Sequence, residues 1–121
     1  MIEGFKYHGT NKAFFATYKD GKWNEGELTS EIHIQISALA TALQYGQSVF
    51  EGLKAYRAKD GRTLLFRVES NHERLVSSCE RLMIPPVPKD LFIQAIKQIV
   101  DANRNLIPAY ETKGSLYIRP F

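Results

Sequence analysis

The stretch Tyr45-Gly-Gln-Ser-Val-Phe-Glu-Gly-Leu-Lys-Ala-Tyr-Arg57 organises the rest of the chain. Gly46 and Gly52 bracket residues 47–51, a segment too short for a stable helix of its own, which predicts a single turn. After Gly52 the side chains alternate, which predicts a strand over Leu53–Arg57. Glycines before a strand let the backbone approach a ligand closely, and they serve equally well to turn a corner. Both interpretations stay open on these residues alone.

Further strands are predicted from short alternations and turn signals. Thr63–Val68 is expected to pair with Leu53–Arg57 through a hairpin whose turn holds Asp60 and Gly61. The remaining strand signals are the hairpin turn Lys19–Lys22 before Trp23, the alternation of Ile32, Ile34 and Ile36 with polar residues, and the final segment Ser115–Phe121.

Two helices are predicted after the Thr63–Val68 strand. The first begins near Ser70, which has capping-box spacing to Glu73, and ends before Pro85 and Pro86. Its apolar arc is Leu75, Cys79 and Leu82, widened by Val76 and Met83. The second, about Lys89–Leu106, is expected to bury Phe92, Ala95, Ile96, Ile99 and Leu106. Strands first and helices later predict an α+β fold with a mostly antiparallel sheet and two main helices.

Composition narrows the class of protein. A chain of 121 residues is expected to form a single domain over residues 1–121. The formal net charge of +3 is modest, and acidic residues are interspersed among the basic ones. The sequence has neither a basic stripe nor a recognisable nucleic-acid-binding motif. The sequence has no apolar run approaching the ~20 residues of a membrane span. The single cysteine is compatible with a reducing compartment, so we expect a cytoplasmic protein that binds neither nucleic acid nor membrane.

A few charged and aromatic side chains could carry chemistry. Arg74 falls in the first turn of its predicted helix, where a cation is mildly unfavourable, so an anion such as phosphate is one interpretation and a surface pair with Glu69 or Glu73 is the other. Tyr117 and Arg119 share one face of their strand and could receive a carboxylate, or could be an edge pair without a ligand. The charges of Glu51, Lys54 and Arg57 are interpreted as structural or interface charges. His8, His33 and His72 lack metal-ligand spacing, so no metal site is predicted.

The ordered blocks of this sequence resemble the branched-chain amino-acid aminotransferases, pyridoxal-phosphate enzymes of the class IV (fold type IV) group. The resemblance runs from about Phe5 to Phe121. It is carried by the Tyr45–Arg57 stretch, Asp60-Gly61, Leu65-Phe66-Arg67, Asn71-x-x-Arg74-Leu75, Arg81-Leu82 and Ser115-Leu-Tyr-Ile-Arg-Pro120. It implies the small N-terminal domain of that architecture and an amino-group transfer between leucine, isoleucine or valine and 2-oxoglutarate.

The resemblance also implies roles for single residues. Arg74 matches the arginine that holds the 5′-phosphate of pyridoxal 5′-phosphate. Tyr117 and Arg119 match positions that receive substrate carboxylates, including the distal one of glutamate, and Phe50 and Tyr45 match the apolar part of the substrate site. Tyr45 would reach into the site of the neighbouring subunit of a homodimer. From the residues alone, both aromatics are equally compatible with core packing.

The family's Schiff-base lysine has no match in this sequence, so no catalytic residue is assigned here. That lysine and the glutamate that binds the pyridinium nitrogen belong to the family's second, larger domain. The chain by itself is therefore expected to be inactive. Three alternatives stay open: a truncated product, a non-catalytic dimerising remnant, or another class IV enzyme such as a D-amino-acid transaminase or an aminodeoxychorismate lyase.

Overall fold

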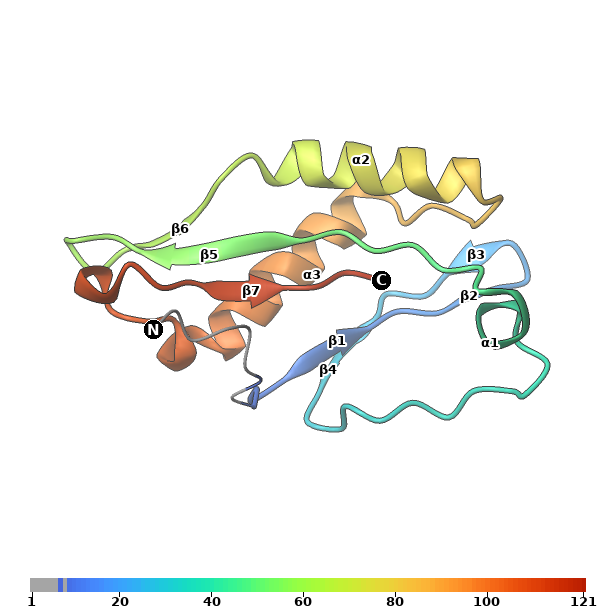
Figure 1. Cartoon of the computed structure of the whole chain (residues 1–121), viewed down its shortest axis with the longest axis horizontal. Coiled ribbons are helices and arrows are strands. Elements are labelled where there is room, and N and C mark those ends of the chain that lie inside the picture. Colours follow the sequence, from blue (N-terminus) through green and yellow to red (C-terminus); the bar gives the residue numbers. More distant parts are fainter. Residues whose placement is uncertain (1–6, 8) are drawn as a thin grey trace.

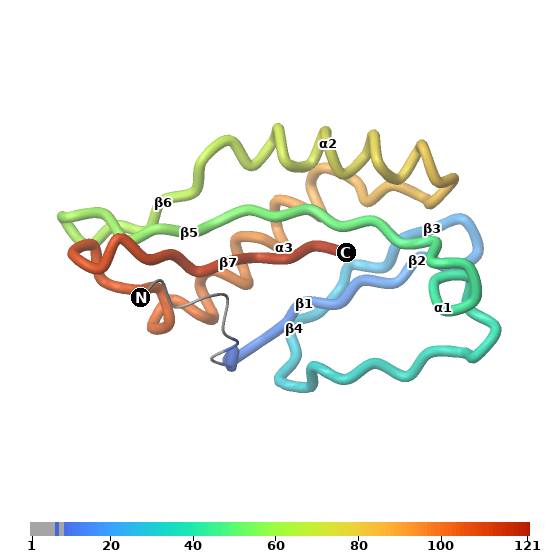
Figure 2. Tube along the Cα trace, in the orientation of Figure 1, coloured from blue at the N-terminus to red at the C-terminus, as the bar shows by residue number. Residues whose placement is uncertain are grey.

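The computed structural model describes Tyr7 and residues 9–121, and Figures 1 and 2 show the path of the chain. Its strands are β1 (Ala13–Phe15), β2 (Tyr18–Lys19), β3 (Lys22–Trp23), β4 (Glu27–Thr29), β5 (Leu53–Arg57), β6 (Thr63–Leu65) and β7 (Leu116–Ile118). Its α-helices are α1 (Thr41–Tyr45), α2 (Val68–Arg81) and α3 (Lys89–Ala102), with 3-10 turns at Arg104–Leu106 and Tyr110–Thr112.

All the described strand pairs are antiparallel. β1 pairs with β4, β2 pairs with β3, and β5 lies between β6 and β7 in a three-stranded sheet. In that sheet Lys54 stands opposite Tyr117, and Ala55 stands opposite both Leu65 and Leu116. The prediction of an α+β fold with a mostly antiparallel sheet and two main helices is confirmed.

The core lies between one face of the three-stranded sheet and the two long helices. Leu53 and Ala55 of β5 are buried, whereas Lys54 and Tyr56, which alternate with them, are exposed, as the alternation predicts. The two long helices supply the rest of the core. In the view of Figure 1, α3 crosses behind β5 and β7, and α2 lies above β5. The buried apolar side chains of this core are Leu53, Ala55, Leu75, Cys79, Phe92, Ile96, Val100, Ile107 and Ile118. Each large one stabilises the fold by about 1.5–3 kcal/mol.

Asn103, at the end of α3, is 1% exposed and fixes the segment that enters β1. Its Oδ1 accepts hydrogen bonds from the amides of Asn11 and Lys12 at 2.8 and 3.2 Å. Its Nδ2 donates to the carbonyls of Lys12 at 3.1 Å and Ile99 at 2.8 Å. A buried side-chain amide with all these bonds made joins two segments that are far apart in sequence.

The first long helix begins and packs differently from the prediction. α2 starts at Val68, so Thr63–Val68 is not a strand to its end, and the residue before the helix, Arg67, adopts φ 52° without a side-chain cap. The predicted capping box of Ser70 and Glu73 is wrong, because Ser70 lies inside the first turn rather than before it. Leu82 and Met83 are 40% and 88% exposed, because the helix ends at Arg81 and the chain turns away.

α3 also ends earlier than predicted. It stops at Ala102, and a separate 3-10 turn follows over Arg104–Leu106. Leu106 is exposed rather than buried, and Val100 and Ile107 take the core positions.

The segment before β5 is the largest departure. The predicted strand at Ile32–Ile36 is wrong, since the segment has no regular structure and its three isoleucines are 46–54% exposed. The predicted turn over residues 47–51 is also wrong. The short helix α1 comes first and ends at Gly46 with φ 66°, and the chain then runs without regular structure into β5. None of the helices in the described part of the chain is both long enough and apolar enough to span a bilayer.

Candidate functional site

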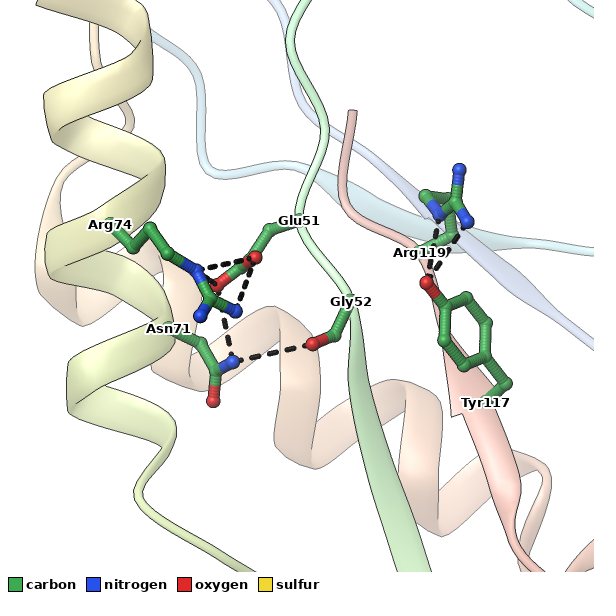
Figure 3. Close-up of polar contacts among 6 residues, drawn as sticks. All are labelled: Glu51, Gly52, Asn71, Arg74, Tyr117 and Arg119. Carbon is green, nitrogen blue, oxygen red and sulfur yellow. Dashed lines mark hydrogen bonds and ion pairs between the residues drawn. The ribbon is translucent and has the colours of Figure 1, made fainter.

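Arg74 forms a two-pronged ion pair with Glu51, as Figure 3 shows. Its Nε donates to Oε1 and Oε2 of Glu51 at 3.0 and 2.9 Å, and its Nη2 donates to Oε1 at 2.7 Å. Arg74 comes from the middle of α2 and not from its first turn as predicted, because the helix begins at Val68. Glu51 comes from the irregular segment just before β5. The expected surface partners, Glu69 and Glu73, are not the ones that Arg74 uses.

The two partners of this ion pair differ in exposure. The Glu51 side chain is 7% exposed, and the Arg74 side chain is 66% exposed. Burial raises the pKa of the Glu51 carboxyl, but the hydrogen bonds from Arg74, Asn71 and the backbone outweigh burial, so its pKa lies below the ordinary value of 4.5. The hydrogen bonds to Glu51 and the attraction of its negative charge raise the pKa of Arg74. Glu51 is therefore a fixed negative charge at neutral pH, and one edge of the Arg74 guanidinium is held against it.

Glu51 is itself held on two sides. The Asn71 side chain, one helical turn before Arg74, donates from Nδ2 to Glu51 Oε2 at 3.1 Å and to the carbonyl of Gly52 at 3.3 Å. The backbone amide of Glu51 donates to the carbonyl of Pro120 at 2.9 Å. The residue is thus connected to α2 through its side chain and to the segment after β7 through its backbone.

Arg119, Tyr117 and Phe50 form a second polar and aromatic group. Arg119 Nε and Nη2 donate to the Tyr117 hydroxyl at 3.3 and 2.9 Å. The Arg119 guanidinium carbon lies 4.4 Å from the centre of the Phe50 ring and 5.2 Å from that of Tyr117. Arg119 is exposed, and it forms no ion pair with any carboxylate in the described part of the chain. The group can receive an anion from solvent.

The predicted site residues fall into these two groups and one outlier. Phe50, Tyr117 and Arg119 are brought together. Arg74 lies apart from them, because the backbone of residues 51–52 runs between Arg74 and the pair Tyr117 and Arg119 (Figure 3). A cavity of about 490 Å³ has Arg119 among its lining residues, and neither Arg74 nor Tyr117 lines it. Tyr45 ends α1 and is 86% exposed.

Gly52 contacts residues of both groups. A Cβ at this position would lie 2.3 Å from the Tyr117 hydroxyl oxygen, so the phenol can cross the backbone here only because the residue is glycine. The carbonyl of the same residue accepts the hydrogen bond from Asn71. The close approach at Gly52 is therefore to a side chain of the same chain, the Tyr117 phenol.

Sequence reasoning missed the parts played by Asn71 and Gly52 and the partner of Arg74. The spacing of Asn71 and Arg74, three residues apart on one helix face, was the signal that could have joined them. Glu51 was interpreted as a structural or interface charge, which its burial and ion pair support. His8 lies outside the described residues, and elsewhere in the described chain no three His, Cys, Asp or Glu side chains gather as metal ligands.

Fold and site together define an α+β domain that carries two exposed arginines, Arg74 and Arg119, one on each side of the stretch that contains Gly52. No protein-family profile matches the chain. The chain is 48% identical over 118 residues to a branched-chain-amino-acid aminotransferase of Helicobacter pylori and, over the same length, to one of Haemophilus influenzae; these matches cover 98% of the chain and 35% and 34% of the relatives. It is 44% identical over 117 residues to a methionine aminotransferase of Arabidopsis thaliana, covering 96% of the chain and 33% of that protein.

The chain is thus related, over almost all of its length, to the N-terminal portion of the branched-chain aminotransferases, and the resemblance stated from the sequence is confirmed. It spans about one third of the length of the curated relatives it matches.

Proposed function

We propose that this chain supplies the phosphate-binding arginine and the substrate-carboxylate site of a pyridoxal-phosphate-dependent branched-chain aminotransferase. The substrates are leucine, isoleucine or valine with their 2-oxo acids, and 2-oxoglutarate with glutamate. The observation that carries the proposal is Arg119, an exposed guanidinium that is oriented by the Tyr117 hydroxyl and the Phe50 ring and has no carboxylate partner in the described chain.

The substrate side of the proposal follows from this geometry. A guanidinium offers paired N–H donors that match a carboxylate, and its orientation by a phenol reduces the ordering that the ligand must supply. The Phe50 ring beside it gives an apolar surface to an aliphatic side chain. Tyr45, at 86% exposure, is proposed as the residue that a neighbouring subunit receives in a homodimer.

The residues also fit the cofactor's phosphate. Arg74 keeps a 66% exposed side chain while one edge is bound to Glu51, so its outer donors are accessible to phosphoryl oxygens. Pyridoxal phosphate, when bound, supplies an electron sink for bond cleavage at the amino-acid carbon. In this division of work Arg74 binds the phosphate end, and Arg119 with Tyr117 orients the substrate by its carboxylate. We assign no proton-transfer step to this chain.

The test of the cofactor part is selective binding by the 121-residue chain. We expect it to bind pyridoxal 5′-phosphate in preference to pyridoxal, and to form no borohydride-reducible lysine adduct. Arg74→Ala should weaken pyridoxal phosphate binding about ten-fold or more, as expected for loss of charged hydrogen bonds. Arg81→Ala is the matched control, because it removes the same charge from an exposed position at the end of the same helix. Equal losses in the two variants would contradict the assignment.

The test of the substrate part is titration with 4-methyl-2-oxopentanoate followed by NMR. Arg119→Ala should abolish the response, and Arg62→Ala, which removes an exposed arginine of the hairpin turn, should not. A response that survives Arg119→Ala would remove the carboxylate role.

The finer points of assembly and location belong to the same proposal. We propose a homodimer in the cytoplasm, where the single cysteine, a buried free thiol, stays reduced. A strictly monomeric species in sedimentation at high concentration would count against self-association.

A further inference from the structure

We propose that Glu51 is a positioning residue for phosphate: it holds the Arg74 guanidinium by its inner edge, so that the outer edge is presented to the phosphoryl oxygens in a fixed orientation. This inference rests on the proposed function, because it deepens the role given there to Arg74. It assigns the recognition of phosphate to a pair of residues from two distant segments, rather than to an exposed arginine alone.

The donors of Arg74 can be accounted for one by one. A guanidinium carries five N–H donors, one on Nε and two on each Nη. Glu51 receives the Nε donor and one from Nη2. One donor of Nη1 and the second donor of Nη2 form the outer, end-on edge, and the other donor of Nη1 points back toward the aliphatic part of the side chain. None of the three makes a hydrogen bond to any residue that the structure describes. That edge has the same paired geometry as the one that binds Glu51, so it can bind a second oxyanion without releasing the first.

The anchor on the inner edge is rigid. Glu51 is 5% exposed, its amide is bound to the carbonyl of Pro120 at 2.9 Å, and its Oε2 also accepts from Asn71. An exposed arginine without such an anchor samples many rotamers, and a ligand must then supply the ordering. With Glu51 in place, the ordering is already present before phosphate arrives.

A carboxylate near a phosphate site also repels the phosphate, so the two effects of Glu51 have opposite signs. The repulsion acts across the guanidinium and next to solvent, where water and salt screen it, because the Arg74 side chain is 66% exposed. The ordering of the guanidinium is not screened. We therefore expect positioning to outweigh repulsion. If so, removing the charge of Glu51 weakens phosphate binding, whereas dominant repulsion would make binding tighter.

The experiment follows the arginine Nε–Hε signals of the ¹⁵N-labelled 121-residue chain during titration with inorganic phosphate and with pyridoxal 5′-phosphate. Glu51→Gln keeps the size of the side chain and removes its charge. We expect the affinity at Arg74 to fall about three- to ten-fold, the range for a ligand that must order one long side chain itself. Glu73→Gln is the matched control, since Glu73 is an exposed acid next to Arg74 in sequence that does not pair with it. That variant should not weaken binding.

Each outcome has a separate meaning. Affinity that is unchanged or tighter in Glu51→Gln would overturn the positioning role and leave Arg74 as the phosphate residue. An Arg74 signal that never responds in the unaltered chain would overturn the phosphate role of Arg74 itself, and this inference with it.

A measurement without substitution covers the case in which Glu51→Gln does not fold. At phosphate saturation the Nε–Hε proton of Arg74 should remain protected from solvent exchange while the Nη signals shift. Loss of that protection would mean that phosphate displaces Glu51, which contradicts the proposal.

Discussion

Replacing Gly52 by alanine tests the close approach on which the geometry of the site depends. The added Cβ would lie 2.3 Å from the Tyr117 hydroxyl oxygen, 3.0 Å from Cζ and 3.3 Å from Cε2. The backbone itself permits alanine, because Gly52 is not among the glycines with positive φ. The strain is therefore steric, and ordinary van der Waals contact requires the phenol oxygen to move by about 1 Å.

The magnitude follows from two opposing terms. Overpacking costs about 1–3 kcal/mol of folding free energy, and loss of glycine freedom in the unfolded chain offsets about 0.4–1 kcal/mol of it. We expect Gly52→Ala to lower the free energy of unfolding by about 1–2 kcal/mol. The Tyr117 hydroxyl accepts a hydrogen bond from Arg119 Nη2 at 2.9 Å, so the displacement also disturbs the proposed carboxylate site.

The assay is chemical denaturation of four proteins: the unaltered chain, Gly52→Ala, Tyr117→Phe and the double variant. Tyr117→Phe removes the atom that the new Cβ would meet first and leaves the ring carbons in tight contact. Gly52→Ala should therefore cost about 0.5–1.5 kcal/mol less in the phenylalanine background. An equal cost in both backgrounds would refute the reasoning that the hydroxyl is the obstacle.

Two further predictions concern the buried polar residues. Asn103→Ala should lower the free energy of unfolding by about 2–4 kcal/mol, because buried amides and carbonyls of the backbone lose their hydrogen-bond partner. The control is Asn105→Ala, at an exposed position, which should cost about 1 kcal/mol or less. Similar losses for the two variants in thermal or urea unfolding would contradict the role given to Asn103. The pKa of Glu51 is lowered on folding, so the unfolded state binds more protons and this residue's contribution to stability is full above about pH 4.5 and is lost as pH falls through the folded pKa. Urea unfolding from about pH 6 to pH 3 should therefore show a steeper loss of stability in the unaltered chain than in Glu51→Gln, and parallel curves would contradict this.

Local patterns predicted the elements whose neighbours in space are also neighbours in sequence. The alternation of Leu53–Arg57 is present in β5, and the Asp60-Gly61 turn joins it to β6. The turn at Lys19–Lys22 joins β2 to β3. Both long helices follow their apolar periodicity through Leu75, Cys79, Phe92 and Ile96. In these elements the local conformational preference and the burial of apolar side chains favour the same structure, so the local pattern is enough to predict it.

The wrong predictions concern segments whose structure depends on tertiary contacts. Ile32, Ile34 and Ile36 alternate like a strand, yet a strand needs a partner for its backbone, and none lies beside this segment in the described chain. At α2, Ser70 has the spacing of a cap, but the helix starts two residues earlier, because Arg67 takes the left-handed conformation at the junction with β6. A helix boundary depends on where the preceding strand releases the chain, and spacing alone does not contain that information.

The candidate site shows the same division between local and distant information. From the sequence, Arg74 had two acids nearby on its own helix, and a helix-surface pair stabilises by only a few tenths of a kcal/mol. The structure offers it instead a carboxylate that is 23 residues away in sequence and almost fully buried, and such a carboxylate needs a cation because burial without one is costly. The ion pair is therefore required by the buried Glu51, which needs a cation, and not by the exposed Arg74, which water can solvate. Arg74 therefore keeps this partner while its side chain stays largely exposed, and this exposure is what the proposed phosphate role requires.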